Sequence, residues 1–490
     1  MVKDSAERDF PDQLSHLNYL NEDTDMEILN ELLDNYNLTP EQLDAVKYSF
    51  LTPTASAIES IEMGLGKTII SLGLLQMIST SLDDKVAIVV APTNTIENFY
   101  RDIVNNTRLR TMTSTGQYAD VIKAIDSIER NLIDCLVVTP SAWTLSEEFN
   151  LFIFNNPDKI ICYIWDECKG DTDKGFNHFI EAGHRTPFVY PLNATITGQG
   201  VSNIYKMLYV CSALDMTERE FIRKYGDYTM TRDNNRIYNI DWGLIKKDYG
   251  DYFINLNRED VGADTVYSRV MFHRCSVTKE QREFLKESTS REVLYAPVDS
   301  KGNQLNIPPT SVPAIAKLIQ TVMGYGPEDN TLIYCRNIVP ANTLYNLLKG
   351  LGYKVFRIDG HTTPTSELKM KSEEEYNKSK GAIMITSISE GSNLNSTDHV
   401  IIYQNPSEVI QYVARAVRGF KSKEITLDWI YYPELEMESF MKNIENAINV
   451  SVGSNRRIEL LEIMLKEVYE VYPNEERLGI FANKILEYNL

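Results

Sequence analysis

Short apolar runs recur between residues 85 and 197, with helical patterns between them. Each run is only four to eight residues long, is rich in β-branched residues and ends at turn residues. This pattern is typical of strands that are buried on both faces of a parallel sheet. The runs lie at 86–92, 135–140, 160–167 and 192–198. We therefore expect an α/β domain in this part of the chain.

The same alternation returns after residue 330. Apolar runs follow at 331–335, 354–360, 382–386, 399–403 and 424–432, with a helix expected over 338–349. From Pro433 onwards the pattern is helical, and the apolar residues of one helix fall on a single face. These residues are Ile458, Leu461, Met464, Leu465 and Val468. We expect a second α/β lobe, with this helix packed on one of the lobes.

Residues 210–312 do not show this alternation of strands and helices. Helical and strand patterns are mixed there, and the segment ends in the polar stretch DSKGNQLNIPPTSVP. The segment is expected to be an insertion followed by a linker. The predicted domains are an acidic N-terminal arm with a helix from about Met26, a first lobe, the insertion and linker, a second lobe and C-terminal helices. Their expected boundaries are 1–37, 38–215, 216–312, 313–432 and 433–490.

The amino-acid composition indicates which class of protein the chain belongs to. With 490 residues, 43% hydrophobic, 24% charged and 10% aromatic, the chain is globular and has room for two or three domains, which excludes a disordered, collagen-like or coiled-coil protein. No window approaches the ~18–20 apolar residues of a spanning helix, and the acidic start is unlike a secretory signal. We expect no membrane partner and a soluble protein, cytoplasmic in a bacterial or virus-infected cell, or nuclear if the source is eukaryotic. The six cysteines form no Cys-x-x-Cys pair, which argues against a disulfide framework or zinc ribbon.

The net charge of −20 argues at first against a nucleic-acid partner. Much of it lies near the ends, since residues 1–50 hold three basic and twelve acidic side chains and residues 421–490 hold eight and thirteen. The remaining 370 residues carry only −6. A locally basic cleft for phosphates is compatible with this distribution, because binding depends on where the cations lie.

The segment EMGLGKT at 62–68 has the composition of a phosphate-binding loop. Its two glycines allow a tight turn whose amides point at phosphate oxygens. Lys67 can reach the terminal phosphates, and Thr68 offers a hydroxyl to Mg²⁺ at a helix start. Ile61 stands where the usual pattern begins with glycine. The predicted loop residues of the ATP site are Met63, Gly64, Leu65, Gly66, Lys67 and Thr68.

An apolar run about 100 residues further on ends in the carboxylates Asp166 and Glu167. A nucleotide-bound Mg²⁺ needs a carboxylate at the carboxyl end of a strand, and hydrolysis needs a second group that orients and deprotonates water. Asp166 suits the first role, beside Thr68, and Glu167 suits the second.

In the second lobe, QYVARAVRGF spans 411–420 and places Gln411, Arg415 and Arg418 at spacings of four and three residues. This spacing puts the three side chains on one helical face, where guanidinium groups can approach a γ-phosphate bound by the other lobe. Arg336 directly follows the strand predicted at 331–335 and is a candidate phosphate contact.

Taken together, these motifs resemble the superfamily-two helicase-like ATPases, most closely the SWI/SNF type, over roughly residues 36–432. EMGLGKT is similar to the variant of the phosphate loop found in that family, in which the first position is not glycine. The resemblance implies two RecA-like parallel-sheet lobes that clamp ATP and Mg²⁺ between them. LTPEQLDAV at 38–46 resembles the upstream motif whose glutamine reads adenine, here Gln42.

Further segments resemble motifs of the same family that contact DNA or couple hydrolysis to movement. They are VVAPTNTIENFYRDI at 89–103, VVTPSAW at 137–143, ITGQGVSNIYKMLYVCSAL at 196–214 and ITSISEGSNLN at 385–395. The resemblance implies DNA contacts by Pro92, Thr93, Thr139, Thr386 and Asn393, and a cofactor contact by Gly391. Two positions depart from the family pattern, since Lys169 replaces a histidine and Gly200 replaces a proline.

We therefore predict an ATP hydrolase that is stimulated by nucleic acid and translocates along double-stranded DNA without separating its strands. The insertion is short for a nucleosome remodeller, which favours a phage, viral or bacterial source. One alternative is a helicase or branch-migration enzyme acting on single-stranded, forked or recombination DNA. A second is an ATP-binding recruitment subunit of a viral transcription or defence complex, with protein partners bound through the acidic arm.

Overall fold

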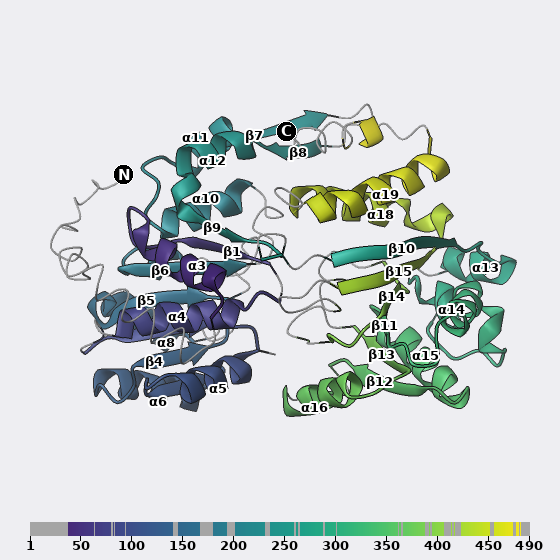
Figure 1. Cartoon of the computed structure of the whole chain (residues 1–490), viewed down its shortest axis with the longest axis horizontal. Coiled ribbons are helices and arrows are strands. Elements are labelled where there is room, and N and C mark those ends of the chain that lie inside the picture. The colour runs from purple at the N-terminus through teal and green to yellow at the C-terminus, as the bar shows by residue number, and fades with distance from the viewer. Residues whose placement is uncertain are drawn as a thin grey trace.

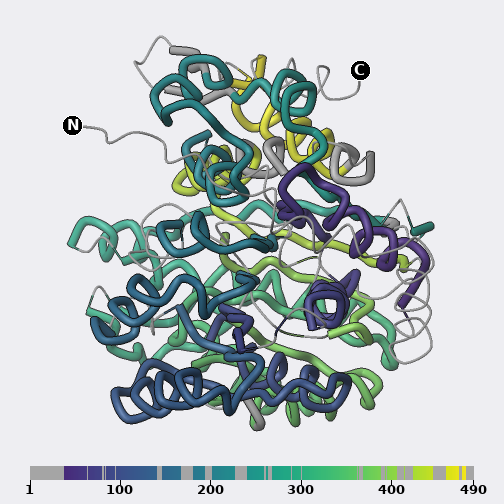
Figure 2. Tube along the Cα trace, turned by 90° about the vertical axis from the view of Figure 1, so that its left-hand side faces the viewer, coloured from purple at the N-terminus to yellow at the C-terminus, as the bar shows by residue number. Residues whose placement is uncertain are grey.

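The structure is a computed structural model of the chain. It describes residues 38–62, 64–79, 82, 84–93, 95–140, 146–166, 180–193, 201–230, 236–258, 261–262, 265–287, 290–299, 301–360, 362–363, 366–387, 392, 394–405, 413, 416, 423–450, 455–473, 477–479 and 481. Figure 1 shows two sheets side by side, with the earlier half of the chain in one lobe and the later half in the other. Figure 2 is turned so that the first lobe faces the viewer and the green and yellow elements of the second lie behind it.

Lobe 1 is built on a seven-stranded sheet in which every pairing is parallel. Its strands, in the order β3-β4-β2-β5-β6-β1-β9, are β3 (Thr111–Ser114), β4 (Cys135–Val138), β2 (Val86–Val90), β5 (Ile160–Trp165), β6 (Phe188–Asn193), β1 (Ile58–Ile61) and β9 (Phe253–Leu256). β2, β4, β5 and β6 are buried along their whole length. The apolar runs predict β2, β4 and β5, whereas β6 begins four residues before the run predicted at 192–198, of which residues 194–198 lie outside the described residues.

Helices cover both faces of this sheet, because alternate strand residues point to opposite sides. One face packs against α3 (Pro40–Leu51), α4 (Lys67–Ser79) and α5 (Ile96–Asn106). The other packs against α6 (Tyr118–Glu129), α8 (Glu147–Asn155), α10 (Val201–Val210), α11 (Glu218–Tyr225) and α12 (Trp242–Tyr249).

Lobe 2 has a six-stranded sheet, also wholly parallel, in the order β10-β15-β14-β11-β13-β12. The strands are β10 (Thr265–Arg274), β15 (Lys423–Tyr431), β14 (His399–Ile402), β11 (Thr331–Tyr334), β13 (Ala382–Thr386) and β12 (Lys354–Ile358). One face packs against α13 (Lys279–Glu287), α14 (Pro313–Met323) and α15 (Ile338–Gly350). The other packs against α16 (Ser366–Asn377), α18 (Pro433–Val450) and α19 (Asn455–Val471).

These two sheets confirm the predicted two-lobe α/β architecture. The predicted C-terminal helical face is also confirmed, since Leu461, Met464 and Val468 of α19 are buried against the lobe 2 sheet and Leu465 packs at their edge. The helix expected near Met26 lies outside the described residues.

The segment predicted as insertion and linker contributes to both lobes. Its β9 extends the lobe 1 sheet beside β1, and its β10 pairs with β15 in lobe 2. Between α11 and α12 it also forms the antiparallel hairpin of β7 (Gly226–Met230) and β8 (Arg236–Ile240). β9 and β10 are outermost strands with partly exposed residues, so they lack the continuous apolar run that identified the inner strands.

None of the helices among the described residues combines the length and the apolar character needed to cross a membrane.

Candidate nucleotide site

The predicted phosphate loop connects β1 to α4 at the carboxyl edge of the lobe 1 sheet. Gly64 has a φ of 86° and Gly66 a φ of 85°, a left-handed conformation that glycine adopts without strain. Leu65 between them is fully buried. A Cβ on Gly66 would lie 2.4 Å from Nε2 of Gln42, so this position also needs glycine for space. α4 begins at Lys67, which directs the free amides of its first turn toward the loop.

Gln42 lies under this loop. Its Nε2 donates to the carbonyl of Leu65 over 2.7 Å, and its Oε1 accepts from the backbone N–H of Thr39 over 3.1 Å. The Thr39 hydroxyl accepts in turn from the backbone N–H of Gln42, which completes a capping box at the start of α3. The residue predicted to read adenine is thus buried and joins α3 to the phosphate loop.

The two charged groups predicted to act on phosphate and metal lie together. Nζ of Lys67 is 3.7 Å from Oδ1 of Asp166, although the residues are about 100 positions apart. Asp166 directly follows β5, and its backbone N–H donates to the carbonyl of Val90 at the end of β2. Both side chains are largely buried, with exposed fractions of 13% and 8%. Thr68, the second residue of α4, is partly exposed.

The start of the loop is fixed to β9. The backbone N–H of Glu62 donates to the carbonyl of Leu256 over 2.9 Å, and a carboxylate oxygen of Glu62 accepts from the backbone N–H of Arg258 over 2.8 Å. Sequence reasoning missed this contact, because Glu62 and Arg258 are 196 residues apart and nothing local marks β9. Leu256 and Arg258 are therefore structural supports of the phosphate loop that only the fold reveals.

The predicted DNA contacts in the described part of the chain lie where strands end. Pro92 and Thr93 follow β2, and Thr139 follows β4 in the same sheet. Thr386 ends β13, and Arg336 follows β11 in the other sheet. Because each sheet is parallel, its strand ends share one edge, which in lobe 1 is the edge that carries the phosphate loop. Thr93 and Arg336 are exposed, whereas Thr139 and Thr386 are buried.

Seven of the predicted site residues lie outside the described residues. They are Met63, Glu167, Gly391, Asn393, Gln411, Arg415 and Arg418. Among the residues that the structure does describe, no cluster of three or more His, Cys, Asp or Glu side chains could hold a metal ion.

Residues 313–421 match the sequence family described as "Helicase conserved C-terminal domain". The central part of lobe 2 is thus similar in sequence to this domain. This match confirms the helicase-like character that the motifs indicated. No curated protein matches the sequence.

Two solved structures are similar to the chain at 14% sequence identity and a TM-score of 0.40. The "Sulfolobus solfataricus SWI2/SNF2 ATPase core in complex with dsDNA" matches over 89% of this chain and 97% of that chain. The "Sulfolobus solfataricus SWI2/SNF2 ATPase core domain" matches over 90% of this chain and 96% of that chain.

Proposed function

We propose that this protein hydrolyses ATP and uses the free energy to translocate along double-stranded DNA. The observation that supports this best is the approach of Lys67 Nζ to within 3.7 Å of Asp166 Oδ1, beside a left-handed glycine turn that opens α4. A lysine, a carboxylate and a helix N-terminus around one small volume suit a nucleotide phosphate with its metal. The helicase C-terminal domain in the same chain fits a nucleic-acid-stimulated reaction.

ATP with Mg²⁺ fits the residues of the site. The amides of the loop and of the first turn of α4 would bind the phosphates together with Lys67. The Thr68 hydroxyl and the Asp166 carboxylate would hold Mg²⁺, directly or through water. When bound, Mg²⁺ neutralises charge that develops on the phosphate oxygens. Gln42 fixes the loop from below through its bond to the Leu65 carbonyl.

The remaining chemical roles are assigned from the sequence motifs alone. Glu167 would orient and deprotonate the attacking water, next to the Asp166 that the structure places beside Lys67. Arg415 and Arg418 of the other lobe would stabilise the transition state once the lobes close, with Gln411, Gly391 and Met63 lining the nucleotide. Pro92, Thr93, Thr139, Arg336, Thr386 and Asn393 would contact the DNA.

The chemistry is tested by replacing the proposed base. Glu167→Gln should leave ATP binding nearly unchanged and lower turnover by ~10² or more, because a positioned general base is lost. Lys67→Ala should weaken nucleotide binding as well, since its ammonium group would contact phosphate when ATP is bound. Hydrolysis by Glu167→Gln at the wild-type rate would show that another group activates water.

The partner is tested by comparing ATP hydrolysis with duplex, single-stranded and forked DNA and with RNA. A translocase should be stimulated by plain duplex and should displace the third strand of a triplex without unwinding a fork. Unwinding of the fork would instead assign a helicase or branch-migration enzyme. If none of these nucleic acids stimulates hydrolysis, the protein would instead be assigned as an ATP-binding recruitment subunit.

A further inference from the structure

β9 is an edge strand of the lobe 1 sheet and, among the described strands, pairs only with β1. The carbonyl of Leu256 accepts from Glu62, so Leu256 turns its peptide groups toward β1. Successive peptide groups along a strand point to opposite sides, which directs the N–H and carbonyl of Asn255 away from the sheet. Neither group has a hydrogen-bond partner among the described residues, and Asn255 is exposed. This strand edge can therefore accept another strand.

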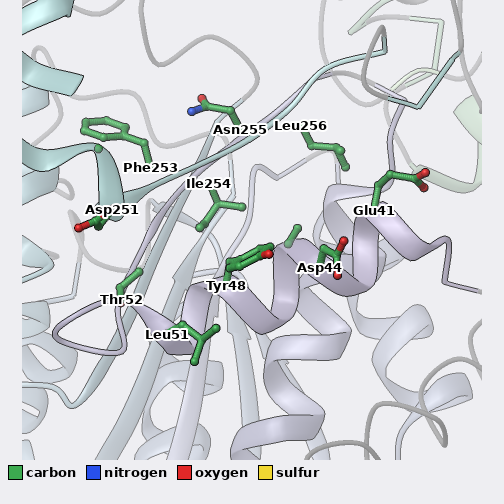
Figure 3. Close-up of a pocket in the computed structure, with 12 residues that line it drawn as sticks. Glu41, Asp44, Tyr48, Leu51, Thr52, Asp251, Phe253, Ile254, Asn255 and Leu256 are labelled. Atoms are coloured by element: carbon green, nitrogen blue, oxygen red, sulfur yellow. The ribbon is translucent and has the colours of Figure 1, made fainter. Parts of the chain in front are cut away.

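A groove of about 520 Å³ runs along this edge between β9 and α3. Figure 3 shows the ring of Tyr48 next to Ile254, with Glu41 and Leu256 toward one end of the groove and Asp251 and Thr52 toward the other. From Glu41 to Leu51 the helix spans ~15 Å, the length of four to five residues of an extended chain. The groove thus has the length of a short strand.

The groove exposes apolar surface that the fold leaves uncovered. Tyr48 is 55% exposed and Leu51 is 64% exposed, although both belong to a helix whose other face is buried in the lobe. Ile254 of β9 adds a partly buried apolar side chain on the opposite side. Large apolar side chains gathered beside an open strand edge are typical of peptide-binding surfaces.

The charge of the groove has one sign. Glu41, Asp44 and Asp251 line it, and no lysine or arginine is among the described residues that do. This charge disfavours nucleic acid, and it disfavours a second copy of the same edge, which would bring two acidic grooves together. It also disfavours residues 1–37 of this chain, which hold two basic and ten acidic side chains. The negative charge of the groove is complemented by a positively charged ligand.

We propose that the groove between α3 and β9 binds an extended, basic segment of a partner protein, which adds a strand to β9. The backbone of the segment would pair with the outward N–H and carbonyl of Asn255. Lysine or arginine side chains would lie against Glu41, Asp44 and Asp251, and an apolar side chain would cover Tyr48 and Leu51. The groove shares Leu256 with the support of the phosphate loop, so binding to it is tested in the absence of nucleotide.

The test uses the full chain without nucleotide and a labelled nine-residue peptide of alternating lysine and valine. Fluorescence anisotropy at low salt should give saturable binding, and the same peptide with glutamate in place of lysine should not bind. A peptide whose amides are N-methylated on one edge should bind at least tenfold more weakly, because it cannot pair with the strand. Equal binding of all three peptides, or no binding of the lysine peptide, would overturn the proposal.

Variants locate the peptide on the protein. Asn255→Pro removes an outward N–H that β1 does not use and should weaken binding at least tenfold, whereas Asn255→Ala should change it less than twofold. Should Asn255→Pro fail to fold, Glu41→Lys with Asp44→Lys provides the same test by charge. Its matched control is Glu374→Lys with Glu375→Lys, two exposed acids of α16 in the other lobe.

If both charge-reversal pairs weaken peptide binding equally, the proposal is overturned, because the peptide would then be attracted by the overall negative charge of the protein and not by the groove. Saturable binding of labelled duplex DNA to the wild type, abolished by Asn255→Pro, would assign the groove to nucleic acid. Self-association of the wild type in light scattering, abolished by Asn255→Pro, would assign it to a second copy of the chain.

Discussion

At the scale of single residues, Gln42 has a structural task that is distinct from reading a base. Its amide donates to the Leu65 carbonyl, and its oxygen closes the capping box with Thr39. A glutamate at this position keeps the capping box but places a carboxylate oxygen against the Leu65 carbonyl. The two tasks of the side chain can therefore be separated by substitution.

Gln42→Glu should weaken ATP binding about tenfold or more, because it breaks the bond that fixes the phosphate loop. Thr39→Ala should lower helix stability by about 1 kcal/mol and leave affinity nearly unchanged, since the bond to Leu65 remains. Titration of each variant with ATP and with GTP measures the two affinities, and urea unfolding measures the stability of Thr39→Ala. Equal weakening toward ATP and GTP supports the loop contact; loss of the preference for ATP alone would support direct recognition of adenine.

Glu59 is a buried carboxyl in β1, five residues before Gly64. The Ser49 hydroxyl donates to its Oε1, while Oε2 has no hydrogen-bond partner among the described residues. Burial raises the pKa of Glu59 from 4.5 to about 8, and the Ser49 bond opposes this only in part. The group is thus protonated in the folded state at neutral pH and ionised in the unfolded chain.

The free energy of unfolding should therefore depend on pH through this residue. The raised pKa stabilises the fold fully below about pH 4.5, and this contribution is lost as pH rises toward about 8, at roughly 1.4 kcal/mol per pH unit. Glu59→Gln should remove that slope in urea unfolding of the protein between pH 5 and 8. Glu129→Gln, an exposed carboxyl of α6, should keep it. An unchanged slope in Glu59→Gln would mean that Glu59 is ionised when folded.

At the scale of elements, β10 is attached to lobe 2 through a buried carboxylate of the neighbouring strand as well as through its backbone. Asp428 of β15 is buried and accepts from Arg269 over 3.0 Å and from the Tyr325 hydroxyl over 2.7 Å, with His273 Nε2 at 2.6 Å. Burial raises the pKa of Asp428, but the bonds from His273 and Tyr325 and the charge of Arg269 outweigh it and leave the pKa below its usual range. Two of these partners belong to β10.

Asp428→Asn should detach β10 more than the rest of the sheet. The expected loss is about 2–3 kcal/mol, because a buried charge network loses its central anion. Hydrogen exchange should rise selectively in residues 265–274. Glu424→Gln, an exposed carboxyl on the same strand, should change stability by less than about 0.5 kcal/mol. Uniform loss of protection across lobe 2 would contradict this role for Asp428.

Most inner strands of both sheets could be predicted from sequence, because burial on both faces makes them largely apolar. β2 and β13, for example, start at the residues where their apolar runs start. The inner strand β1 was missed, because two of its four residues are Glu59 and Ser60. β9 and β10 could not be found in this way, because their residues are partly exposed and each strand pairs with one that is distant in sequence. The hydrogen bonds that join Glu62 to Leu256 and Arg258 could not be predicted either, because these residues are also distant in sequence. The phosphate-loop glycines were predictable, because their left-handed conformation restricts the residue type locally.

At the scale of the whole molecule, the proposed reaction depends on both lobes at once. Lys67 and Asp166 belong to lobe 1, whereas Arg415 and Arg418 fall in the segment of the sequence that matches the helicase C-terminal domain family. An arginine supplied from the opposite lobe acts when the lobes close, so its loss should slow the chemical step more than it weakens nucleotide binding.

Arg418→Ala should lower turnover by ~10³ with little change in ATP affinity, and Arg415→Ala should act similarly. Arg282→Ala, an exposed arginine of lobe 2 paired with Glu434, should keep the wild-type rate. Steady-state hydrolysis combined with nucleotide titration separates the two effects. Equal losses in affinity and turnover would place Arg418 in ground-state binding instead.

The described chain passes from one lobe to the other through the eight residues between Leu256 of β9 and Thr265 of β10. Fully extended, a connection of this length spans at most about 29 Å. Such a tether keeps each lobe at an effective concentration on the order of millimolar around the other. Closure is then a first-order event, so turnover per molecule should not change on dilution. Two fragments divided at Gly262 would instead need to meet by diffusion, and at micromolar concentrations they would remain mostly apart.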